Sequence, residues 1–113
     1  MLNEIGQKIQ REFQANNAPC QRVIGLIQLI SNKARFRIIC VLSHGEFCVK
    51  EIAEILGEGK MSNISQQLKI LTLAGVVDRR REEKKIIYRL VDHRMRDLIA
   101  YFREHFLPPL NLS

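Results

Sequence analysis

Two short amphipathic segments in the middle of the chain constrain its fold more than any other feature. The first ends at Gly57, and the second runs from Ser62 to Ala74 and is followed by Gly75. Their apolar residues recur at spacings of three and four, as on one face of a helix: Val49, Ile52, Ala53 and Leu56 in the first segment, and Ile64, Leu68 and Leu71 in the second. Two short helices joined by a glycine-containing turn predict a helix-turn-helix.

A β-hairpin with a charged tip is expected directly after these helices. Val76 and Val77 lead into Arg79-Arg80-Arg81, and residues 86–90 are rich in the β-branched and aromatic residues that favour strands. Between residues 78 and 89, six basic residues stand against three acidic ones, a local excess of three positive charges. A ribbon of this kind beside a helix can grip a polyanion, although Glu82 and Glu83 make its tip an uncertain contact.

Amphipathic helices are also expected at both ends of the chain. One is stopped by Asn16-Asn17-Ala18-Pro19, and the other by Pro108-Pro109. A chain of this length has little core for them to cover, so we expect their apolar stripes to pair across a homodimer. The expected dimer residues are Leu2, Ile5, Ile9, Phe13, Met95, Leu98, Ile99, Phe102 and Phe106.

The length and composition indicate a single domain over residues 1–113. The chain has 113 residues and is 46% hydrophobic, which suits one packed core. Residues 23–30 and 36–42 are the most apolar and predict the two core helices. The expected fold is mainly α with a small β-hairpin: a winged helix-turn-helix with five to six helices and a two-stranded wing.

The charge balance favours a polyanionic partner, either nucleic acid or an anionic membrane surface. Lys and Arg number 18 against 12 Asp and Glu, a formal net charge of +6. No apolar run approaches the roughly 18 to 20 residues of a membrane span, and the start, Met1-Leu2-Asn3-Glu4, lacks the pattern of a secretory signal. We therefore expect a cytoplasmic protein without a membrane partner.

The exposed face of the second short helix suits the major groove of double-stranded DNA. Ser62, Gln66 and Lys69 lie opposite its apolar face, and amides, hydroxyls and lysine are the groups that bond base edges and phosphates. The alternative is that these polar residues only keep the helix soluble. The predicted DNA contacts are Lys60, Ser62, Asn63, Ser65, Gln66, Gln67, Lys69, Arg79, Arg80, Arg81, Lys84 and Lys85.

Residues 22–107 resemble the ArsR/SmtB family of small winged-helix repressors. The resemblance rests on several motifs that occur in order: Asn32-Lys33-Ala34-Arg35-Phe36-Arg37-Ile38-Ile39, Gly45-Glu46-Phe47-Cys48-Val49, Ile52-Ala53, Ser62, Ser65-Gln66-Gln67-Leu68-Lys69, Leu71, Gly75 and Tyr88-Arg89-Leu90. It implies a homodimeric repressor that is released by a chemical signal. A dimer places two recognition helices about one DNA turn apart, so we expect it to read an inverted-repeat operator. The chain departs from the family in the turn around Lys60, at Gln67, where many members have His, and at the wing tip, which has no Gly.

Metal sensing is not favoured by the residues that stand at the family's metal sites. Of the thiol box of arsenic-type members only Cys48 matches, because Lys50 and Ala53 replace the other thiols. Of the zinc ligands of other members, Asp92 and His105 match and remain weak candidates, whereas Arg94 and Pro108 replace the rest. No metal or other cofactor is expected.

Three cysteines, Cys20, Cys40 and Cys48, are candidates for thiol sensing. Cys40 stands where the resemblance places one of the two redox cysteines of the thiol-sensing subgroup, but no Cys occurs near Phe106, where the second would lie. Only Cys20 or Cys48 could pair with it. The alternative is that all three are small buried apolar residues. The effector is left open.

Catalysis is not expected. His44, His93 and His105 have no evident nucleophile partner, and the sequence has neither a Gly-rich phosphate loop nor a paired-carboxylate motif. The alternative from another class is a winged-helix module that binds a protein through the same polar helix. Salt-dependent DNA binding distinguishes the two.

Overall fold

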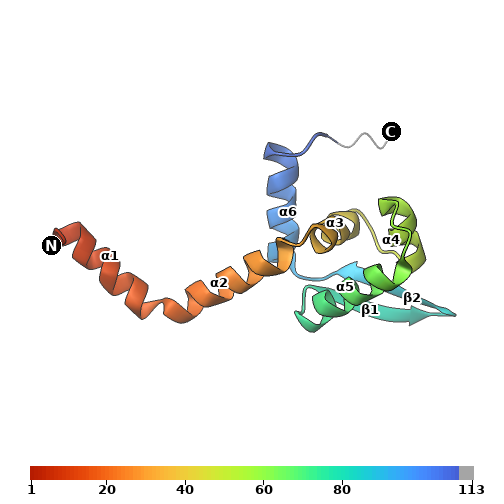
Figure 1. The fold of residues 1–113 in the computed structure, drawn as a ribbon, viewed down its shortest axis with the longest axis horizontal. Coiled ribbons are helices and arrows are strands. Elements are labelled where there is room, and N and C mark those ends of the chain that lie inside the picture. Colours follow the sequence, from red (N-terminus) through yellow and green to blue (C-terminus); the bar gives the residue numbers. More distant parts are fainter. Residues whose placement is uncertain (110–113) are drawn as a thin grey trace. The chain divides into compact units, whose positions relative to one another are not determined.

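The structure, a computed structural model, describes residues 1–109 and divides the chain into two compact units, Met1–Ser31 and Asn32–Ser113. The first unit holds α1 (Glu4–Ala15) and α2 (Asn17–Ile30). The second holds α3 (Lys33–Leu42), α4 (Val49–Leu56), α5 (Met61–Leu73), β1 (Val77–Glu82), β2 (Lys85–Leu90) and α6 (His93–His105) (Figure 1). The six helices and two-stranded wing within residues 1–109 confirm the expected fold class.

The connection between α1 and α2 differs from the sequence-based expectation. Asn16 alone separates α1 from α2, whereas a stop over residues 16–19 was expected. Pro19 lies in the first turn of α2, where its missing N–H costs no helical hydrogen bond, so it does not delay the helix. The expectation that residues 23–30 form a core helix is wrong, because α2 has no buried residue.

The buried apolar core lies in the second unit. It includes Ile38, Ile39 and Leu42 of α3, Ile52 of α4, and Ile64, Leu68 and Leu71 of α5, each at most 1% exposed. Met95 and Ile99 of α6 are also fully buried there. These two residues were expected at a dimer interface, and the structure corrects that expectation: they face the core of their own chain.

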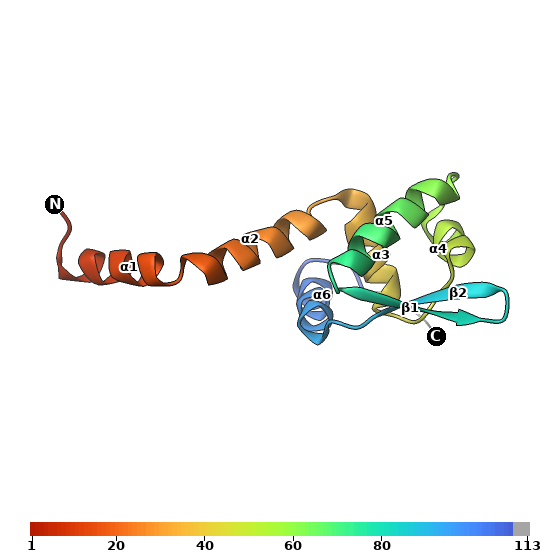
Figure 2. The same ribbon diagram turned by 90° about the horizontal axis from the view of Figure 1, so that it is seen from below.

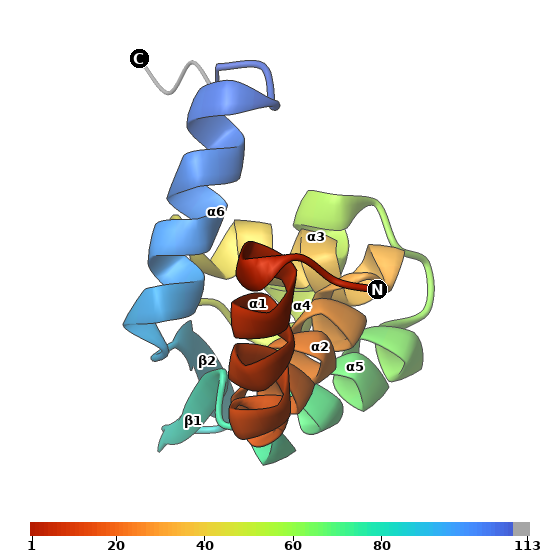
Figure 3. The same cartoon turned by 90° about the vertical axis from the view of Figure 1, so that its left-hand side faces the viewer.

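Caps that the sequence encodes fix where the helices of this unit begin. The Asn32 side chain accepts a hydrogen bond from the N–H of Arg35 at 3.0 Å, and Asp92 accepts from the N–H groups of Arg94 (2.9 Å) and Met95 (3.2 Å). Such caps satisfy backbone donors that the first helical turn leaves free. α6 thus starts close to the hairpin and runs away from it (Figure 3).

The two strands form an antiparallel hairpin whose pairs run from Val77 with Leu90 to Glu82 with Lys85. Glu83 at the tip has a φ of 58°, a left-handed conformation that favours glycine. Phe47, in the loop before α4, pairs with Tyr88 through two backbone hydrogen bonds of 2.9 and 3.2 Å. The outer edge of β2 is thereby tied to the chain that enters α4.

The arrangement of α5 and the hairpin decides whether they can act together. α5 packs against α3, α4 and β1. Two perpendicular views show the hairpin running beside α5, with the hairpin tip and the first turn of α5 toward the same end of the unit (Figures 1 and 2). Within residues 1–109, no helix is long and apolar enough to cross a membrane.

Candidate nucleic-acid interface

The helix-turn-helix consists of α4 and α5 and has the boundaries that its glycines predict. Cys48 and Glu51 form a capping box at the start of α4, in which the Cys48 N–H donates to Glu51 Oε1 at 2.9 Å. This hydrogen bond is the main reason why the pKa of Glu51 is lowered. Gly57 ends α4 with a φ of 67°, and Gly75, with a φ of 78°, follows α5.

The start of α5 is held by a residue that the sequence analysis missed. Glu58 accepts hydrogen bonds from the N–H of Lys60 at 3.1 Å and from Asn63 Nδ2 at 3.3 Å. These two donors, in that order, lower the pKa of Glu58. Asn63 is half-buried, and its amide nitrogen is engaged by Glu58 rather than directed outward.

α5 separates a buried face from an exposed one. Ile64, Leu68 and Leu71 are at most 1% exposed and anchor the helix in the core. Five of the predicted DNA contacts on α5 and its N-cap are exposed: Lys60, Ser62, Ser65, Gln66 and Lys69. Leu73 continues this face at the far end of the helix and is 79% exposed, and Met61 at the start of α5 is 51% exposed, so the polar residues of α5 lie between two exposed apolar side chains.

Gln67 occupies the border between these two faces. It is half-buried, and its Oε1 accepts a hydrogen bond from Arg35 Nη1 of α3 at 3.0 Å. Its amide oxygen therefore orients α5 against α3. Its predicted role as a DNA contact stays a prediction.

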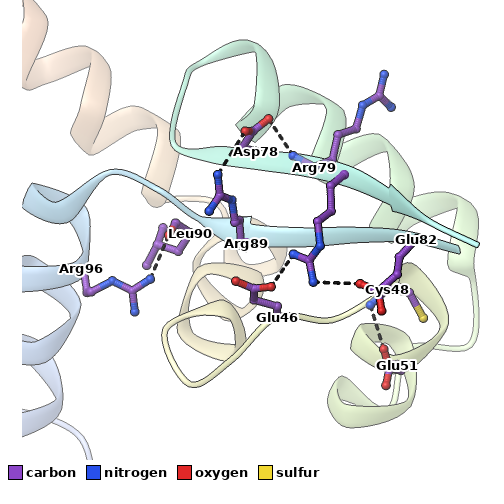
Figure 4. A network of polar contacts seen from close by, with 10 residues as sticks. Glu46, Cys48, Glu51, Asp78, Arg79, Glu82, Arg89, Leu90 and Arg96 are labelled. Carbon is purple, nitrogen blue, oxygen red and sulfur yellow. Dashed lines mark hydrogen bonds and ion pairs between the residues drawn. The ribbon is translucent and has the colours of Figure 1, made fainter.

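The three arginines of β1 are all exposed, but they are not equivalent. Arg80 forms ion pairs with Glu46, in the loop before α4, and with Glu82 at 3.1 Å (Figure 4). Arg79 and Arg81 have no ion pair in the part of the chain that the structure describes. Arg81 Nε donates to the backbone oxygen of Glu83 at 3.4 Å, so neither charge is paired with a carboxylate among the described residues and both remain available to phosphate.

The wing has little freedom to change its orientation. Besides the Phe47 pairing, Arg96 Nη2 of α6 donates to the backbone oxygen of Leu90 at 2.9 Å, and Arg89 pairs with Asp78 at 3.7 Å (Figure 4). The Phe47 and Arg96 contacts hold β2 against the loop before α4 and against α6, whereas the Arg89–Asp78 pair joins the two strands to each other. Lys84 and Lys85 at the tip are exposed, as a phosphate contact requires.

The three thiols lie in different surroundings, and all are free. Cys48 is buried at the capping box, which favours a structural role. Cys40 is half-buried in α3, where burial raises the pKa of its thiol and Arg103 partly opposes this rise. Cys20 lies in α2, in the other unit, so the sensing role of any pair stays a prediction.

The two weak metal candidates lie at opposite ends of α6. The Asp92 carboxylate caps the start of that helix, and His105 is its last residue. Among residues 1–109, no group of three or more His, Cys, Asp or Glu side chains is placed to hold a metal ion.

The predicted dimer residues outside the core remain accessible. Leu2, Ile5, Ile9 and Phe13 are 47 to 69% exposed although they are large and apolar. On α6, Leu98 and Phe102 are half-buried, and Phe106 just after it is exposed. Their role in a dimer stays a prediction, now without Met95 and Ile99.

Comparison with known proteins places this geometry in a family. Residues 32–79 match the model of the bacterial regulatory proteins of the arsR family. A biofilm growth-associated repressor of Agrobacterium fabrum is 38% identical over 84 residues, which cover 74% of this chain and 71% of that protein. The chain belongs to the ArsR family. The resemblance stated from the sequence motifs is thereby confirmed.

Other ArsR-family relatives and solved structures agree with this assignment. The transcriptional repressor SmtB of Mycobacterium tuberculosis is 32% identical over 74 residues, 66% of this chain and 54% of that protein. The crystal structure of the repressor BigR from Xylella fastidiosa superposes with a TM-score of 0.75 at 29% identity, covering 88% of this chain and 98% of BigR. A homodimeric winged helix-turn-helix DNA-binding domain from Mycobacterium bovis superposes with a TM-score of 0.66 at 25% identity, covering 80% of this chain and 91% of that domain. The winged helix-turn-helix fold is thereby confirmed.

Proposed function

We propose that this ArsR-family protein is a transcriptional repressor that binds double-stranded DNA through α5 and the wing. One observation carries the proposal: the exposed polar start of α5 and the tip of the arginine-bearing hairpin lie toward the same end of one unit. A duplex laid against that end meets a helix that fits the major groove and a ribbon that reaches the neighbouring backbone.

The residues of α5 and those of the wing contribute to DNA binding in different ways. Gln66 offers an amide that can bond adenine on two atoms, and the hydroxyls of Ser62 and Ser65 bond either kind of base. Arg79 and Arg81 neutralise phosphates, which supplies affinity and salt dependence rather than sequence choice.

The protein acts as a homodimer in this proposal. The apolar stripe of α1 is exposed in a single chain, and a second copy is the partner that would cover it. Two copies present two α5 helices to successive major grooves about 34 Å apart, so the operator is an inverted repeat. The protein works in the cytoplasm, where the bacterial chromosome lies. Release by a thiol or metal signal stays a prediction.

The proposal is tested by selecting duplexes from a random pool and measuring their affinity by fluorescence anisotropy. We expect an inverted repeat that binds with an affinity falling steeply as salt rises, and a scrambled duplex that binds more weakly. A folded protein that enriches no sequence and shows no salt-dependent binding would contradict the proposal and favour a module that binds protein instead.

A further inference from the structure

An apolar cavity of about 470 Å³ lies in the second unit, away from the polar face of α5. It is bounded by α3, by the end of α4 and by Leu107 beyond α6, and Phe36, Phe47 and Ile55 form much of its wall. A second cavity of about 230 Å³ shares Cys40, His44 and Leu107 with it. The larger cavity alone is within the range of roughly 300 to 1,000 Å³ that small-molecule sites occupy.

The charged groups at these cavities are basic. Arg37 lines the larger cavity and Arg103 the smaller one, and no carboxylate is among the described residues that line either. The charge of Arg37 interacts with the nearby carboxylate of Glu58, and Arg37 Nη2 donates to the backbone oxygen of Leu56 at 3.0 Å. Arg103 donates only to the neutral hydroxyl of Ser43 and has no ion pair within residues 1–109.

His44 and Cys40 line both cavities. Burial, and then the nearby charge of Arg103, lower the pKa of His44 and so disfavour the charged form of its imidazole. Of the two guanidinium groups at the adjoining cavities, that of Arg37 lies near the carboxylate of Glu58, whereas that of Arg103 has no ion pair within residues 1–109. An apolar wall that leads to one guanidinium without a carboxylate partner fits a ligand with an apolar body and one negative end.

We propose that these two cavities, which share Cys40, His44 and Leu107, together bind a small organic carboxylate, with its apolar body against Phe36, Phe47 and Ile55 and its carboxylate at Arg103. The site also suggests an effect on DNA binding, since Ile55 and Leu56 belong to α4, the first helix of the helix-turn-helix. That effect rests on the proposed function, whereas binding of the carboxylate does not.

The probe is decanoate, titrated by calorimetry against the full chain in the absence of DNA. We expect saturable binding that weakens by up to about fifteenfold with octanoate, because each buried CH₂ contributes about fourfold. Arg103→Gln should weaken decanoate binding at least about tenfold and leave decanol binding unchanged, because only the carboxylate needs the charge. Arg94→Gln, on the exposed side of the same helix, is the matched control and should bind decanoate as the wild type does.

The alkylation rate of Cys40 tests where the ligand binds without any substitution in the protein. Decanoate should slow alkylation of Cys40 by iodoacetamide and leave Cys20 in the first unit unaffected. Ile55→Trp, which fills the cavity, should abolish decanoate binding without removing a charge. Absence of saturable binding, or equal binding by wild type and Arg103→Gln, overturns the assignment, as does binding that leaves Cys40 unprotected.

The effect on DNA is measured separately with the selected operator. Bound decanoate should change operator affinity, and the operator should change decanoate affinity by the same factor. Binding of decanoate without any change in operator affinity overturns the effector role. Failure of DNA binding itself would contradict the proposed function and leave the carboxylate site standing.

Discussion

Arg35 Nη1 of α3 donates to Gln67 Oε1 of α5 at 3.0 Å, across 32 positions of sequence. This hydrogen bond joins a core helix to the middle of the helix that we propose reads DNA. It orients the exposed face of α5 without itself being part of that face.

Removal of this contact should cost stability more than specificity. Gln67→Ala should lower the free energy of unfolding by about 1 kcal/mol, since a partly buried hydrogen bond to a charged group is lost. The measurement is urea denaturation of the variant beside Gln10→Ala, which removes an exposed glutamine of α1. Unchanged stability together with complete loss of operator binding would show instead that Gln67 touches DNA.

Gln66 should behave in the opposite way. Because its side chain is exposed on α5, Gln66→Ala should leave stability unchanged and weaken operator binding by roughly 1 to 3 kcal/mol if the amide bonds a base on two atoms. Affinity for a scrambled duplex should stay the same in an anisotropy assay. An equal loss on both duplexes would reject base recognition by this residue.

Glu58 should make the stability of the turn before α5 depend on pH. Its folded-state pKa is lowered by the hydrogen bonds from Lys60 and Asn63, so its contribution is fully present above the ordinary glutamate pKa of about 4.3 and is lost as pH falls through the lower folded value. Wild type should therefore be more stable than Glu58→Gln at pH 7, and the difference should disappear near pH 2. Urea denaturation at both pH values measures this.

The control for this prediction is Glu54→Gln, which changes an exposed glutamate of α4 outside the turn before α5. Its stability relative to wild type should not follow the same pH course. A difference between wild type and Glu58→Gln that persisted at the lowest pH would mean that the carboxylate charge is not what holds the turn.

Local signals predicted the helix-turn-helix well. Gly57 and Gly75 mark the ends of α4 and α5 within a residue of the expected positions, because a left-handed residue ends a helix wherever it occurs. The hairpin followed equally well from its β-branched residues and its charged tip. Such features depend on neighbours in the sequence and can be read without the fold.

Contacts between distant segments could not be predicted in this way. The pairing of Arg80 with Glu46 spans 34 positions, so the local sequence does not distinguish Arg80 from Arg79 and Arg81. The apolar residues of α2 led to the prediction of a core helix. Their hydrophobicity indicates that α2 is covered, but it does not distinguish the core of the same chain from the surface of another molecule. Pro19 likewise indicates a stop in isolation but is compatible with the first turn of a helix.

The salt dependence of operator affinity tests the central claim most directly, namely that the wing and α5 bind DNA together. The slope of log affinity against log salt should fall in magnitude by about four per bound dimer when Arg79→Ala and Arg81→Ala are combined, because each subunit loses two guanidinium groups and each of these neutralises about one phosphate. The matched variant, Lys8→Ala with Arg11→Ala, removes two exposed cations of α1 and should keep the wild-type slope. An unchanged slope in the wing variant, or an equal fall in both variants, would contradict the placement of DNA against the wing.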